Sequence, residues 1–186
     1  MAAELTDSDL ALHAMLVSGW LTAERLAGWG VPEPGQVLAG LSSEGLVRVA
    51  RTSRGEMFTL TGDGQRRAQT WSDAWLAELP AADKDTLLSL LDRFEDLDPQ
   101  LKRVVSQCQQ GGEAATALAR LHDAARGTVT SIAAIGPHWL SYPGRLDHAV
   151  SQVAQGCAEY VASPLVDSYH TVWHLLHRDL RMTKAG

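Results

Sequence analysis

The chain has 186 residues, of which 45% are hydrophobic and 20% charged, and its formal net charge is -6. These values are ordinary for a globular protein and leave room for one large domain or two small ones. No stretch approaches the roughly 20 apolar residues of a membrane-spanning helix. The amino end lacks the basic and apolar regions of a signal peptide, and the two cysteines lack metal-ligand spacing. We therefore expect a cytoplasmic protein without a membrane partner.

Three helices are predicted in the first 45 residues. Thr6 and Thr22 are candidate N-caps for the first two, which end near Gly19 and Gly28. Pro34 suits the first turn of a third helix that runs to Glu44 and is closed by Gly45.

A β-hairpin with a basic tip is predicted between Leu41 and Gly64. Residues 46–50 alternate as a half-buried strand, residues 52–55 (Thr-Ser-Arg-Gly) supply turn chemistry, and residues 57–60 form the return strand. Thr61 follows as the N-cap of the next helix. Between residues 48 and 67 there are five arginines and two acidic residues, so positive charge is concentrated at this hairpin.

This order of elements, with Gly45-Leu46-Val47, Arg54-Gly55 and a Leu60-Thr61-Gly62-Asp63-Gly64 helix entry, resembles MarR- and PadR-like winged-helix DNA-binding domains over residues 5–75. The resemblance implies that residues 22–26 form the positioning helix and residues 34–44 the recognition helix. The predicted fold is therefore mainly α: an N-terminal winged helix-turn-helix with a two-stranded β-wing in residues 1–75, then an all-α helical bundle in residues 76–186.

The resemblance implies a transcriptional regulator that binds double-stranded DNA as a homodimer. Its expected DNA-contacting residues are Arg25, Gln36, Ser43, Arg48, Arg51 and Arg54. However, no basic residue lies between Pro32 and Gly45, whereas base readout in the major groove favours arginine, lysine, asparagine or glutamine. The alternative is a winged-helix interaction module that controls a partner enzyme without binding DNA.

From Asp73 onward the pattern is helical. A long helix is expected over residues 113–135, a turn at residues 142–144, and a last helix from Ser163 to Met182. These helices are expected to dimerise or to sense a small-molecule effector.

Two side-chain sets in this part are candidate sites. His170, His174 and His177 share one face of the last helix at metal-compatible spacing, but they flank its apolar stripe, so hydrogen bonding across the bundle is favoured over a metal site. Trp71, Trp75 and Trp173 are candidates for a ligand pocket, although packing between helices is the favoured role. No phosphate loop or nucleophile elbow is present, so neither catalysis nor a cofactor is expected.

Overall fold

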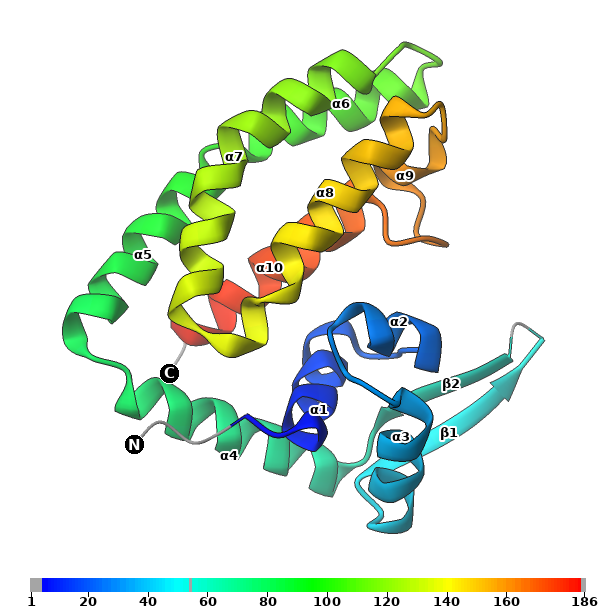
Figure 1. The fold of residues 1–186 in the computed structure, drawn as a ribbon, viewed down its shortest axis with the longest axis vertical. Helices are drawn as coiled ribbons and strands as arrows, with labels where there is room; N and C mark the ends of the chain where they lie inside the picture. Colours follow the sequence, from blue (N-terminus) through cyan, green and yellow to red (C-terminus); the bar gives the residue numbers. More distant parts are fainter. Residues whose placement is uncertain (1–4, 54, 185–186) are drawn as a thin grey trace. The chain divides into compact units, whose positions relative to one another are not determined.

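The computed structural model describes residues 5–53 and 55–184, and it divides the chain into two compact units. The first unit ends at Pro80 and the second begins at Ala81. Both are mainly helical, and a two-stranded antiparallel sheet belongs to the first (Figure 1). The helix that spans residue 75 continues to Glu78, two residues before the first unit ends.

Three short helices open the first unit, each placed by local sequence signals. They are α1 (Asp7–Ser18), α2 (Ala23–Gly28) and α3 (Pro34–Ser43). The predicted caps of the first two are confirmed, because the Thr6 and Thr22 hydroxyls accept hydrogen bonds from the backbone N–H groups of Asp9 and Arg25. The third begins at Pro34, as predicted, but its N-cap residue Glu33 makes no side-chain cap and has a φ of +46°.

The predicted hairpin is also confirmed, with longer strands than expected. β1 (Val47–Thr52) pairs with β2 (Gly55–Leu60), and the register joins Val47 to Leu60 and Thr52 to Gly55. An isolated antiparallel bridge joins Leu21 to Phe58, so the segment between α1 and α2 lies beside β2. The sheet therefore ties the start of α2 to the hairpin.

The last helix of this unit, α4 (Gly62–Glu78), starts against the base of the hairpin. Thr61 caps it and also donates its hydroxyl hydrogen to the carbonyl oxygen of Gly45, 2.7 Å away. Gly64 faces the backbone of Leu46 so closely that a Cβ atom would collide with the Leu46 carbonyl. Glycine is thus required there by close approach of two backbones.

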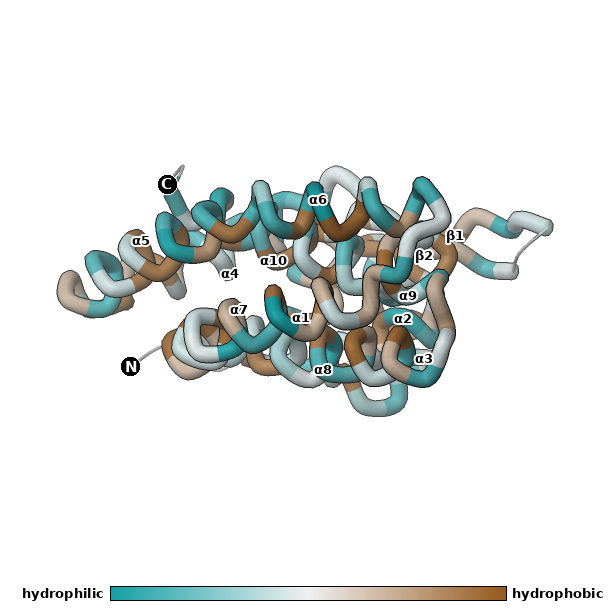
Figure 2. The backbone as a smooth tube through the Cα atoms, turned by 90° about the horizontal axis from the view of Figure 1, so that it is seen from above, coloured by the Kyte–Doolittle hydropathy of each residue, from teal (hydrophilic) through white to brown (hydrophobic). Residues whose placement is uncertain are grey.

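Six helices and one 3₁₀ turn make up the described part of the second unit. They are α5 (Ala81–Glu95), α6 (Asp98–Gln109), α7 (Ala115–Ile135), the turn η1 (Pro137–Trp139), α8 (Ser141–Ala154), α9 (Glu159–Ala162) and α10 (Tyr169–Lys184). Each of α7 and α10 packs against both α5 and α8, which closes a bundle. Apolar and polar residues alternate along these helices, as the colours of α6 show in Figure 2. The apolar faces point into the bundle core.

Aromatic rings occupy the centre of this bundle. Trp173 is fully buried and stacks on Phe94, with ring centroids 4.0 Å apart. Its indole N–H donates a hydrogen bond to Asp98 Oδ1 at 2.7 Å, which satisfies the polar atom of the ring.

Two predicted elements of this half are wrong. Residues 142–144 lie in the first turn of α8, where a proline is tolerated because the first helical N–H groups need no partner within the helix. The final helix begins at Tyr169 instead of Ser163, with the Ser168 hydroxyl accepting a hydrogen bond from the backbone N–H of Thr171. None of the helices in the described ranges is both long and apolar enough to cross a membrane.

Candidate functional site

The outward face of α3 carries small, uncharged side chains. Gln36, Ala39, Gly40 and Ser43 are all exposed, whereas Leu38 and Leu41 are buried, as the helical pattern predicted. The Ser43 hydroxyl donates to the carbonyl oxygen of Gly40 at 2.7 Å, so it is engaged within its own helix. Gln36 is therefore the one expected contact residue on α3 with a long polar side chain directed away from the core.

The hairpin and α2 carry the remaining expected DNA contacts. Arg48 lies over the exposed ring of Trp20, with its guanidinium carbon 5.7 Å from the ring centroid. Arg51 is 84% exposed and its Nε lies 3.2 Å from Glu56 Oε1 across the hairpin. Arg25 is half-buried on α2, and Arg54 lies outside the described residues. Arg48 and Arg51 are thus exposed along one strand, and Arg51 is partly neutralised by a carboxylate.

A groove of about 610 Å³ lies between the start of α2, one side of α3 and strand β2. Leu38 and Phe58 contribute apolar surface to it, and Glu24 and Glu56 contribute carboxylates. The sequence pattern does not reveal this groove, because its walls come from three segments that only the folded unit brings together.

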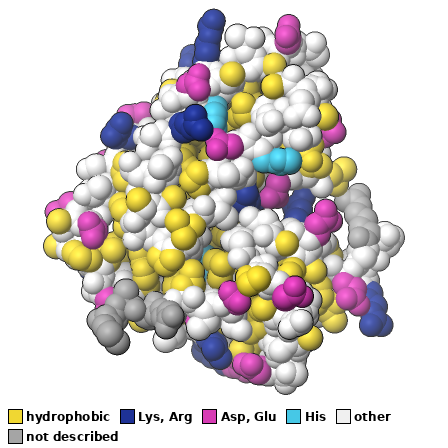
Figure 3. Space-filling view, in the orientation of Figure 1, with side chains coloured by type: hydrophobic (Ala, Val, Ile, Leu, Met, Phe, Trp, Pro, Cys, Tyr) yellow, Lys and Arg dark blue, Asp and Glu magenta, His cyan; other side chains and the backbone are white. Residues whose placement is uncertain are grey.

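Other arginines of the first unit are also paired with acids. Arg66 pairs with Asp63, and Arg67 lies 3.8 Å from Asp9 and 3.5 Å from Glu44. Among the described residues on the face drawn in Figure 3, basic and acidic side chains are interspersed. The positive charge near the hairpin is therefore smaller than the count of arginines suggests.

The three histidines of α10 do not share one environment. His170 and His174 lie with their Nε2 atoms 3.0 Å apart, and burial lowers the pKa of both imidazoles. His177 instead lies 2.8 Å from Glu95 and 3.7 Å from Asp98. The structure therefore brings two of the candidate metal ligands together and directs the third to carboxylates of the bundle.

The three tryptophans proposed as pocket residues are divided between the units. Trp71 and Trp75 are buried on α4, and Trp71 packs edge-on against the ring of His13, 5.8 Å away, with His13 placed on α1. Trp173 belongs to the core of the second unit. Each is thus held by packing inside its own unit.

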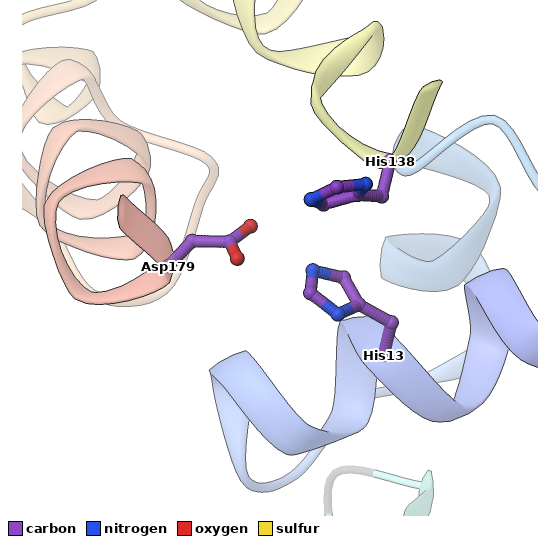
Figure 4. A group of neighbouring side chains, drawn as sticks. All are labelled: His13, His138 and Asp179. Carbon is purple, nitrogen blue, oxygen red and sulfur yellow. The ribbon is translucent and has the colours of Figure 1, made fainter. Parts of the chain in front are cut away.

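The sequence pattern does not predict several buried polar groups of the second unit. Asp179 is 1% exposed and accepts a hydrogen bond from the Tyr142 hydroxyl at 3.0 Å, and burial raises the pKa of that phenol. The nearest nitrogen of His138 lies within 4.8 Å of the same carboxylate (Figure 4, which also draws His13 of the first unit). Asp179 follows Leu176 by three residues, so helical spacing places both on the buried face of α10. This spacing is the sequence feature that could have indicated the burial of Asp179.

Comparisons with protein-family models, curated proteins and solved structures find no match to this chain.

Proposed function

We propose that the chain is a winged-helix transcriptional regulator of MarR/PadR-like type that binds double-stranded DNA. The observation that carries the proposal is the joint placement of α2, α3 and the hairpin, with the Leu21–Phe58 bridge holding α2 beside β2. In this arrangement α3 acts as the recognition helix and the hairpin as the wing.

The side chains on α3 support close approach to a DNA groove. Ala39 and Gly40 are exposed and small, so the helix backbone can approach bases or sugars without steric obstruction. Gln36 supplies an amide that can pair with adenine. Arg48 and Arg51 on the wing contact phosphates, which set position and affinity but carry no sequence information.

Dimerisation through the second unit completes the proposal, because two reading heads double the DNA contact. Leu140 and Leu165 are 65% and 66% exposed in this unit, and we propose them as the residues that contact a second copy. We expect sedimentation equilibrium to give the mass of a dimer, and a Leu140→Ser, Leu165→Ser variant to sediment as a monomer. Wild type that sediments as a monomer at micromolar concentration would contradict this part of the proposal.

DNA binding is tested by titrating labelled genomic fragments at several salt concentrations. We expect selective binding that weakens with salt. For the dimer, the log–log salt slope of an Arg48→Ala, Arg51→Ala variant should be smaller by about 4, since two arginines are lost from each of two subunits and each lost phosphate contact removes nearly one unit. The matched control is Arg103→Ala, Arg120→Ala, which removes the same charge from exposed positions on α6 and α7. Equal salt slopes for the two double variants would exclude the wing as the DNA contact.

The groove beside α3 favours a second candidate, a winged-helix interaction module that binds a basic protein segment. Its apolar floor and its two carboxylates, Glu24 and Glu56, complement a peptide with leucine and lysine side chains. The same carboxylates repel phosphate, which opposes DNA binding on this side of α3.

A Glu56→Gln variant separates the two candidates, because it changes the two affinities in opposite directions. Removal of this carboxylate frees Arg51 and strengthens DNA binding, whereas it weakens binding of a Lys/Leu octapeptide. We expect the variant to bind DNA more tightly than wild type does, and neither protein to bind the peptide measurably. Peptide binding that weakens in the variant, with no DNA binding even at low salt, would instead support the interaction module.

A further inference from the structure

Two imidazoles of α10 lie side by side where solvent reaches them. His174 is exposed and His170 is partly exposed, so an ion from solution can approach the pair. The two residues are four positions apart, which places them one turn apart on the same face of the helix. Two histidines with this helical spacing are a known pair of ligands for one metal ion.

The distance between the two Nε2 atoms suits neighbouring ligand positions around a single ion. These atoms are 3.0 Å apart, whereas the ring centroids are 4.4 Å apart, so each ring turns its Nε2 edge toward the other ring. With metal–nitrogen bonds of about 2.05 Å, the separation corresponds to an N–metal–N angle of about 94°. This angle is close to that of square-planar or tetragonal complexes, the geometry that Cu²⁺ and Ni²⁺ prefer.

Both imidazoles are also in the protonation state that a metal ion requires. A histidine ligand must be neutral, and burial lowers the pKa of His170 and of His174 below the ordinary value of 6.5. In the metal-free pair, one Nε2 donates a hydrogen bond to the other. On metal binding the donating ring takes its other neutral tautomer, with the proton on Nδ1, so that both Nε2 lone pairs face the ion.

The pair supplies two ligands and leaves the other coordination positions open. His177, the third histidine of this helix, is directed instead to the Glu95 carboxylate, 2.8 Å away. Over residues 5–53 and 55–184, no further histidine, cysteine, aspartate or glutamate brings a ligand atom within 4.8 Å of both Nε2 atoms.

We propose that His170 and His174 bind one Cu²⁺ or Ni²⁺ ion through their Nε2 atoms, with water in the remaining positions. This inference does not depend on the proposed DNA binding, because both ligands belong to the second unit.

Calorimetric titration of the full, untagged chain with Ni²⁺ at about pH 7.5 tests the site. We expect His170→Gln and His174→Gln each to weaken binding by about a hundredfold, since a single remaining ligand loses the advantage of chelation. Two controls, His177→Gln and His148→Gln, remove the third histidine of α10 and an exposed histidine of α8. Both controls should bind as wild type does. Unchanged affinity in His174→Gln, or an equal loss in His177→Gln, would overturn the assignment of the two ligands.

Electron paramagnetic resonance of the chain with one equivalent of Cu²⁺ gives a second readout that does not depend on affinity. We expect hyperfine coupling to two imidazole nitrogens in wild type and to one in His174→Gln. Circular dichroism checks that this variant keeps its helices, as expected for an exposed side chain. Wild-type spectra without nitrogen coupling, or identical spectra for wild type and His174→Gln, would contradict the proposal.

Discussion

At the scale of the residue, Glu95 joins two helices of the second unit through one oxygen atom. Its Oε1 lies 2.8 Å from His177 Nε2 and 2.8 Å from the Arg181 Nε that donates to it. These hydrogen bonds, first that of His177 and then that of Arg181, lower the pKa of the Glu95 carboxyl below its ordinary value of 4.5. The ionised carboxylate is therefore the form that the folded state favours.

The sign of the resulting pH dependence follows from this direction. A carboxyl whose pKa is lower in the folded state contributes stability above about pH 4.5, and that stability is lost as the pH falls through the lower, folded-state pKa. We expect Glu95→Gln to lower the free energy of unfolding by about 0.5–1 kcal/mol at pH 7, the range of partly exposed ion pairs. The effect should be smaller at pH 3, because protonation of the carboxyl removes its ionic hydrogen bonds as the pH falls. Urea unfolding at the two pH values measures the difference.

Glu113→Gln is the control for this experiment, because Glu113 is exposed just before α7. It should change stability little at either pH. If the free energies of unfolding of Glu95→Gln and wild type differed by the same amount at pH 3 and pH 7, the carboxylate charge would not be the source of the stability.

At the scale of the element, two helical glycines are predicted to respond oppositely to one added methyl group. Gly64 lies in the first turn of α4, where a Cβ atom collides with the Leu46 carbonyl, and backbone cannot move aside as a flexible side chain can. Gly127 lies in the middle of α7, and a Cβ atom there meets nothing within 4 Å. Helix propensity favours alanine at both positions, so steric contact decides the sign.

We expect Gly64→Ala to destabilise the first unit by about 1–3 kcal/mol, as overpacking does, and to displace α4 from the hairpin. Gly127→Ala should stabilise the second unit by about 0.5–1 kcal/mol. Thermal unfolding followed by circular dichroism measures both. A neutral Gly64→Ala would contradict the close approach of α4 to Leu46.

Helix and strand boundaries that depend on neighbouring residues are the ones that could be predicted from sequence. Thr6, Thr22 and Thr61 cap their own helices within three residues, and Gly55 provides the positive φ at the end of the hairpin turn. The start of the last helix was wrong because Ser163–Pro164 looks like a helix entry, although the chain continues through a non-helical segment to Ser168. Local capping patterns do not distinguish a helix that starts at Ser163 from one that starts after Ser168, because a serine stands at both positions.

At the scale of the whole molecule, the unpredicted features share a different cause. Trp173–Asp98, Tyr142–Asp179 and His122–Asp147 join residues of different helices. Their pairing depends on which helices pack against each other in the bundle. The spacing of apolar residues predicts the buried face of each helix, but it does not predict which other helix that face contacts. The groove of the first unit could not be predicted for the same reason, because three separate segments form its walls.

The second unit has its own buried core, and we expect it to fold independently of the first unit. Five of its large apolar residues are each at most 1% exposed in the full chain: Phe94, Leu101, Leu118, Trp139 and Trp173. A chain of this size buries enough apolar surface to fold alone. We therefore expect a fragment of residues 81–186 to be helical and to unfold cooperatively, with the emission of its two tryptophans shifted to the blue.

A fragment of residues 91–186 is the matched control. It lacks most of α5, including the buried residues Leu87 and Leu90, and α5 packs against both α7 and α10. Without it those two helices expose their apolar faces, so the shorter fragment should show red-shifted tryptophan emission and no cooperative transition. Cooperative unfolding of the shorter fragment would mean that α5 is not part of the core. Failure of the longer fragment would mean that the second unit depends on residues before Ala81 for its stability.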